Sequence, residues 1–198
     1  MVTLPGASKQ MILFCGPSGS GKTTIVHYIL ARDARFKFSI SATTRKKRIN
    51  EKDGEDYHFL SVDDFKKKIT EGAFIEWEEV YENGFYGTLH SEVQSILSEE
   101  KIPVFDLDVV GGLSIKKQFG DKVLSIFVRP PDIESLKQRL TLRATETAED
   151  LKRRLDKAVH EMTFADKFDK VLINHSIDEA CTQVEGWLKE YFLHQVIK

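Results

Sequence analysis

The sequence has only two cysteines, five prolines and two tryptophans among its 198 residues, and it contains no long apolar run. Cys15 and Cys181 lie far apart among apolar neighbours, which favours buried free thiols over a disulfide. The apolar runs are far shorter than a membrane span, and no segment near the start joins a charged stretch to an apolar one. We therefore expect a cytoplasmic protein with no membrane partner.

The sequence also has no large excess of positive or negative charge. Lys and Arg total 29, Asp and Glu total 31, and the formal net charge is −2. A chain without a basic field has no general affinity for nucleic acid, so affinity for anions must come from local clusters. Repeats and low-complexity tracts are absent as well, and the length suits one domain with a substantial core.

A complete phosphate-binding pattern is present near the start of the chain. MILFCGPSGSGKTT, residues 11–24, places an apolar strand before a glycine-rich loop and a helix start, and it matches the P-loop at Gly16, Gly21, Lys22 and Thr23. Backbone N–H groups of such a loop surround a polyphosphate, the lysine reaches its outer phosphates, and the threonine hydroxyl ligates Mg²⁺. A Gly/Ser-rich turn could fit the pattern by chance, but here all the parts are in register.

Strand-like and helix-like segments alternate along the whole chain. Apolar strands are expected at residues 11–15, 104–112 (VFDLDVVGG), 122–128 and 170–174, with helical spacing between them. This pattern predicts an α/β fold like that of the P-loop nucleoside-triphosphate hydrolases, a parallel sheet covered by helices on both faces. Ligands of such sheets bind at the carboxyl ends of the strands.

Two segments depart from this alternation. Residues 42–89 are expected to form a small β-rich insertion, and residues 137–157 a helical lid that carries Arg139, Arg143 and Arg154. A basic helix is usually just solvated, but beside a phosphate site it is typical of a mobile lid. The remaining core of the single domain is expected in residues 11–41, 90–136 and 158–198.

Several charged residues outside the loop are open to two interpretations. The basic run at residues 45–48 is either a solvated turn or a second anion site, and its closeness to the P-loop favours the second. Glu76 lies among aromatic residues, either as a surface residue or as a polar anchor inside a base pocket. Asp106 and Asp108 end a buried strand, where carboxylates need a cation or strong donors, and Asp106 is the favoured magnesium ligand.

These motifs together resemble the guanylate kinases. The resemblance covers residues from about 11 to the last helix and rests on GPSGSGKTT, FSISATTRKKR, DGEDYHF, FIEW, YGT, FDLDVVG and RLTLRATE followed by RRL. It implies the reversible, Mg²⁺-dependent transfer of the γ-phosphoryl group of ATP to GMP, with dGMP as a further acceptor, in purine nucleotide metabolism. ATP and GMP are the implied partners, and no protein partner is indicated.

The resemblance also implies roles for residues at matching positions. The ATP-binding residues would be Gly16, Pro17, Ser18, Gly19, Ser20, Gly21, Lys22, Thr23, Thr24, Arg139 and Asn174. The GMP phosphate would be held by Ser41, Arg45, Arg48, Tyr57 and Tyr86, and guanine would be read by Glu76, Thr88 and Asp108. Thr23 and Asp106 would hold magnesium, and the catalytic residues would be Lys22, Arg45, Arg143 and Arg154.

The chain departs from the family pattern at two positions. Val110 stands where the family often has glutamine, and Ala144 stands where the lid motif has glycine. Two rival functions remain to be weighed. One is a scaffold domain that holds phosphopeptides in the GMP cleft, although such domains typically lack a working P-loop; the other is a kinase for a different small phosphorylated acceptor. Glu76 with Thr88 favours guanine.

Overall fold

A five-stranded parallel sheet forms the centre of the molecule. The computed structural model describes residues 11–141 and 148–193, except for the side chains of residues 148 and 150. The strands of the central sheet, in spatial order, are β2 (Phe36–Phe38), β7 (Ile102–Leu107), β1 (Met11–Cys15), β8 (Val123–Arg129) and β9 (Lys170–Ile173). Neighbouring strands all pair in parallel. The predicted α/β fold with a covered parallel sheet is confirmed.

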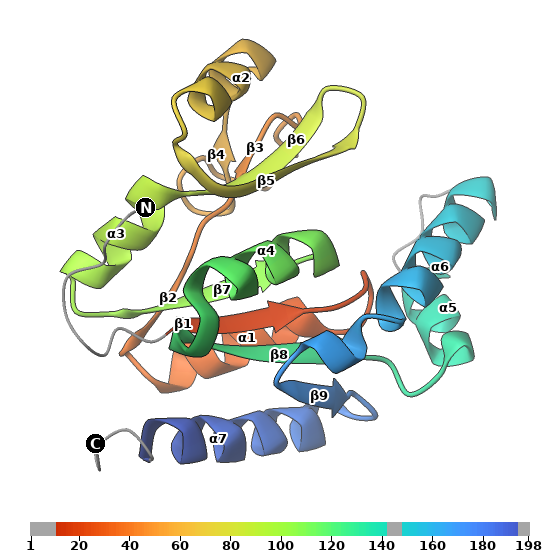
Figure 1. Ribbon diagram of the computed structural model, residues 1–198. Helices are drawn as coiled ribbons and strands as arrows, with labels where there is room; N and C mark the ends of the chain where they lie inside the picture. Colours follow the sequence, from red (N-terminus) through yellow and green to blue (C-terminus); the bar gives the residue numbers. More distant parts are fainter. Residues whose placement is uncertain (1–10, 142–147, 194–198) are drawn as a thin grey trace.

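Helices cover both faces of this sheet (Figure 1). One face packs against α1 (Lys22–Arg32) and α7 (Ile177–Leu193), and the other against α3 (His90–Ser98) and α4 (Val109–Phe119). Side chains alternate along β1, so Ile12 and Phe14 face the first helix pair while Leu13 faces the second. All five residues of β1 are buried, as expected for a central parallel strand. Short 3₁₀ turns lie at Gly120–Lys122 and Ala165–Lys167.

The expected strand over VFDLDVVGG is wrong in its second half. Strand β7 ends at Leu107, and Asp108 caps α4, because its Oδ1 accepts a hydrogen bond of 3.0 Å from the N–H of Gly111. Two adjacent β-branched valines favour a strand by local propensity, but the capping carboxylate and the burial of Val109 and Ile115 against the sheet stabilise a helix instead. The two aspartates therefore lie at a strand end and at a helix start.

A second, smaller sheet lies above the first (Figure 1). Its spatial order is β4 (His58–Phe59), β3 (Ala42–Thr43), β6 (Gly84–Leu89) and β5 (Phe74–Tyr81), and helix α2 (Val62–Thr70) covers it. The side chain of Phe65 on α2 stacks on Phe74, with ring centroids 4.3 Å apart. Strands β5 and β6 are antiparallel, so residues that lie opposite each other share one face of the hairpin.

Helices α5 (Ile133–Thr141) and α6 (Ala148–Met162) form a pair at one side of the molecule (Figure 1). Leu136, Leu140 and Ala158 make the buried contact between them. The junction between the two helices, with Arg143 and Ala144, lies outside the described residues. Within the described ranges, no helix has the length and apolar character needed to cross a membrane.

Candidate active site

The glycine-rich loop joins β1 to α1 at the carboxyl edge of the central sheet, and neighbouring elements shape it. Gly21 has a φ of 97°, and a Cβ at this position would lie 2.3 Å from Nδ2 of Asn174, so only glycine fits. The same Nδ2 donates to the Ser20 carbonyl at 2.8 Å. Arg139 Nη2 donates to the Asn174 carbonyl at 2.9 Å. Asn174 after the end of β9 and Arg139 in the last turn of α5 thus brace the loop backbone.

Asn174 is almost fully buried, with 2% of its surface exposed. Both it and Arg139 contact the loop backbone in this structure, and their contact with ATP stays a prediction. Arg154 of α6 is another arginine that the sequence predicts to act at the site. Its Nη2 donates to Ser18 Oγ at 2.7 Å. This contact links α6 directly to the phosphate loop.

Lys22, Thr23 and Asp106 meet beneath the loop. Lys22 Nζ donates to the carbonyls of Gly16 and Pro17 at 2.6 and 3.1 Å and lies 4.0 Å from Asp106 Oδ1. Thr23 Oγ1 donates to Asp106 Oδ2 at 2.6 Å. One hydroxyl and one carboxylate suit Mg²⁺, which takes oxygen ligands and fills its other positions with water and substrate phosphates. The described residues contain no cluster of three or more His, Cys, Asp or Glu that could hold a metal.

Two adjoining cavities open at this edge. A cavity of about 300 Å³ is lined by the loop, Lys22, Thr23 and Asp106 together with Lys157 and Glu161 of α6. A second cavity, of about 470 Å³, lies under the smaller sheet. Tyr57, Asp106 and Arg154 line both, so the two cavities adjoin one another at these side chains. The arrangement can hold two ligands end to end.

The second cavity has a phenolic end, and a guanidinium lies next to it. The Arg45 guanidinium lies over the Tyr57 ring, 5.0 Å from its centroid, and the rings of Tyr57 and Tyr86 are 6.1 Å apart. Both tyrosines and Ser41 line the cavity. A guanidinium fork with neighbouring hydroxyls is suited to a phosphate monoester.

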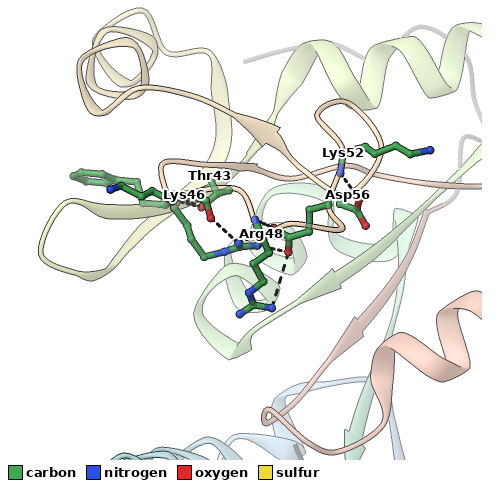
Figure 2. A network of polar contacts seen from close by, with 8 residues as sticks. Thr43, Lys46, Arg48, Lys52 and Asp56 are labelled. Carbon is green, nitrogen blue, oxygen red and sulfur yellow. Dashed lines mark hydrogen bonds and ion pairs between the residues drawn. The ribbon is translucent and has the colours of Figure 1, made fainter. Parts of the chain in front are cut away.

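Arg45 also has an acidic partner that sequence analysis missed. Its two terminal nitrogens donate to the two carboxylate oxygens of Glu51, both at 2.8 Å. This pairing raises the pKa of Arg45 and lowers the pKa of Glu51 to about 2. The backbone N–H of Arg48 donates to Glu51 at 2.8 Å, and Arg48 Nη1 lies 4.0 Å from Glu51 Oε1; Figure 2 shows the Arg48 side chain in this network. The Arg48 side chain is nevertheless 77% exposed. The structure thus brings Arg45 into the tyrosine cluster and leaves the Arg48 guanidinium outside it.

The other end of the second cavity is acidic. Thr88 Oγ1 donates to Glu76 Oε1 at 2.6 Å across the β5–β6 ladder. A Cβ at Gly111 would lie 2.9 Å from Glu76 Oε2, so α4 approaches this carboxylate closely only because that position is glycine. Sequence analysis missed Gly111, since the contact joins a strand and a helix that are distant in the chain. Val110, one of the two family departures, is exposed on α4.

Glu76 titrates in the neutral range. Burial raises the pKa of Glu76 to about 7, the bond from Thr88 opposes this rise, and the nearby Asp108 carboxylate adds to it. Asp108 has a cationic neighbour in Lys157, whose Nζ lies 3.6 Å from Asp108 Oδ2 and 3.6 Å from Glu161 Oε1. Lys157 and Glu161 are further residues of the site that sequence analysis did not identify, because α6 approaches β7 only in the folded chain.

The raised pKa of Glu76 predicts a pH dependence. At low pH the carboxyl is protonated and loses acceptor capacity for a ligand N–H pair, so kcat/KM for an acceptor with such a pair should fall as pH decreases through about 7. Between about pH 8 and about pH 6 the fall due to Glu76 should be roughly 10-fold. Glu76→Gln should remove that part, and comparing the two proteins at each pH cancels the titration of the substrate. Parallel profiles for the two proteins would contradict this assignment.

Comparison with known proteins identifies the family. The sequence profile of the guanylate kinases matches residues 8–191. The chain is 47% identical to a guanylate kinase of Bacteroides fragilis over 92% of its own length and 89% of the relative's. It is 43% identical to a guanylate kinase of Porphyromonas gingivalis over 92% of its own length and 97% of the relative's.

Solved structures agree on the fold. Guanylate kinase from Anaplasma phagocytophilum superposes with a TM-score of 0.73 at 24% identity, covering 93% of this chain and 87% of the other. Shikimate kinase from Bacteroides thetaiotaomicron superposes with a TM-score of 0.50 at 14% identity, covering 91% and 98%. Kinases with different acceptors thus share this architecture, and the assignment rests on the sequence relatives. The chain belongs to the guanylate kinase family.

Proposed function

We propose that this protein transfers the γ-phosphoryl group of ATP to GMP, reversibly and with Mg²⁺, and that dGMP is a second acceptor. The observation that carries the proposal is the adjoining pair of cavities, one at the phosphate loop and one that ends at Glu76, which accepts a hydrogen bond from the buried Thr88. We also propose that the reaction takes place in the cytoplasm, where both nucleotides are available, and serves purine nucleotide metabolism.

The loop cavity is the proposed donor side. The loop N–H groups and the amino end of α1 hold the ATP phosphates, and the Lys22 ammonium exchanges its loop carbonyls for phosphate oxygens. Thr23 and Asp106 would hold Mg²⁺, which would neutralise phosphate charge. Asn174 and Arg139 keep the loop backbone in its phosphate-binding shape.

The cavity under the smaller sheet is the proposed acceptor side. Arg45, Tyr57 and Tyr86 hold the GMP phosphate, with Ser41 beside them and with Arg48 as a residue that must move inward. At the opposite end, Glu76 accepts from guanine N1–H and N2–H. Thr88 and Asp108 complete the reading of the base. Residues 42–89 therefore form the GMP-binding region.

Phosphoryl transfer at this site depends on positioning and charge. The acceptor phosphate oxygen is already a nucleophile, so neither a covalent intermediate on the protein nor a strong base is needed. Arg154 lies where the two cavities adjoin, and it stabilises charge on the transferred group. Arg143, on the junction of the proposed lid at residues 137–157, would act with it. Closure of the lid excludes water, which would otherwise compete with GMP.

A coupled assay tests the proposal. The protein is incubated with ATP, Mg²⁺ and, in turn, GMP, AMP, CMP and UMP, and ADP formation is followed. We expect fast turnover with GMP alone among these four acceptors, and none when EDTA replaces Mg²⁺. A phosphopeptide-binding domain would produce no ADP, and a kinase for another acceptor would leave GMP unphosphorylated; either result contradicts the proposal.

A further inference from the structure

Glu78 is a carboxylate of the acceptor cavity to which no role has yet been given. It lies on β5 two residues beyond Glu76, and both side chains line the same cavity. In the β5–β6 ladder Glu76 lies opposite Thr88, and Glu78 lies opposite Tyr86. The two pairs therefore occupy one face of the hairpin, separated by a two-residue step of roughly 7 Å.

The pairing of β5 with β6 places the residues proposed to bind the base and those proposed to bind the phosphate at successive positions along the hairpin. Glu76 and Thr88 lie at the proposed guanine end. Tyr86 belongs to the cluster with Arg45 and Tyr57 at the proposed phosphate end. In a nucleoside monophosphate the sugar connects the base to the phosphate. Glu78 lies one two-residue step from Glu76 and directly opposite Tyr86, so it lines the stretch of cavity over which a sugar would join the base to the phosphate.

One carboxylate oxygen of Glu78 has no partner in the described part of the chain, although the side chain as a whole contacts Asp108. Its Oε2 is buried and has no hydrogen-bond partner among the residues that the structure describes. Burial, followed by the neighbouring Asp108 carboxylate, raises the pKa of Glu78. Lys157 lowers it, but the ion pairs that Lys157 makes with described residues are those with Asp108 and Glu161. A buried acceptor without a donor requires an explanation, and a ligand hydroxyl supplies one.

Carboxylates are well suited to sugar hydroxyls. In dinucleotide-binding folds an Asp or Glu accepts a hydrogen bond from the ribose 2′-hydroxyl, and a bond to a charged acceptor is stronger than one between neutral groups. We propose that Glu78 accepts a hydrogen bond from the 2′-hydroxyl of the acceptor nucleotide and thereby makes the enzyme prefer GMP to dGMP. This inference rests on the proposed function.

The ratio of kcat/KM for GMP to kcat/KM for dGMP tests the inference. The wild-type protein should favour GMP by about 10-fold or more, the effect of one hydrogen bond to a charged group. In Glu78→Ala the ratio should fall close to 1. Removal of one negative charge also relieves repulsion at Glu76 and Asp108, but this affects both substrates equally and cancels in the ratio.

Two further variants sharpen the test. Glu82→Ala removes the same charge from the exposed hairpin turn outside the cavity, so it should keep the wild-type ratio. Glu78→Gln keeps a neutral acceptor, so an intermediate ratio is expected even if Glu78→Ala folds poorly. An unchanged ratio in Glu78→Gln and Glu78→Ala, or a wild-type ratio near 1, would overturn the inference alone. Failure of the wild-type protein to phosphorylate either nucleotide would instead overturn the proposed function.

Discussion

Replacing Lys22 with methionine should lower kcat by about 10³-fold or more while GMP binding stays nearly unchanged. The ammonium lies at the loop cavity, and the acceptor cavity is lined by other residues. Methionine keeps the length and most of the volume of the side chain but cannot neutralise phosphate charge. The loss should therefore be concentrated in the transition state, where that charge is redistributed during transfer.

The measurement combines steady-state kinetics with calorimetric titration of GMP. Lys67→Met is the matched control, because Lys67 lies on the exposed side of α2 and pairs there with Glu71 at 4.0 Å. Thermal unfolding of both variants shows whether the loop survives the loss of the two hydrogen bonds that Lys22 donates to it. Turnover of Lys22→Met within about threefold of the wild-type value would refute the donor-side assignment.

The second large effect concerns the choice of base. The protein should prefer GMP to AMP by roughly 10⁴-fold, since adenine presents a lone pair at N1 where guanine presents a donor, and buried polar groups of the site would be left unpaired. Glu76→Gln should lower kcat/KM for GMP by about 1.5–3 kcal/mol, or roughly 10- to 150-fold, because a charged acceptor is lost. ATP binding should not change.

Glu79→Gln provides the control for this prediction. Glu79 is on the same strand but is exposed, does not line the cavity, and accepts a hydrogen bond from the Asn83 N–H at 2.8 Å. The same substitution there should leave kcat/KM for GMP and the ratio of GMP to AMP unaltered. If Glu76→Gln behaves like Glu79→Gln, then Glu76 supports the strand and has no part in reading guanine.

The parts of the fold that sequence analysis predicted depend on local patterns. The loop motif predicts the β1–α1 turn because each glycine and the lysine act within one short segment, and the buried strand β1 follows from its continuous apolar run. Thr23 and Asp106 could be paired from the sequence because two neighbouring parallel strands, β1 and β7, end at the same edge. Their action on magnesium stays a prediction.

Other features depend on contacts between distant segments. Glu51 could have been found from its spacing after the two arginines of the basic run, but its bidentate bond to Arg45 needs the loop conformation. The contact of Lys157 with Asp108 depends on how α6 lies against the end of β7. The helix start at Asp108 was missed because local propensity at Val109 and Val110 opposes the outcome that capping and burial determine.

The brace between Asn174 and the Ser20 carbonyl has a consequence for biosynthesis. The two residues are 154 positions apart, and at ribosomal rates the second follows the first by roughly 8 to 30 s. During that interval a nascent chain has its glycine motif but neither β9 nor the amide that fits against Gly21. The brace of the glycine-rich loop is therefore completed late in translation.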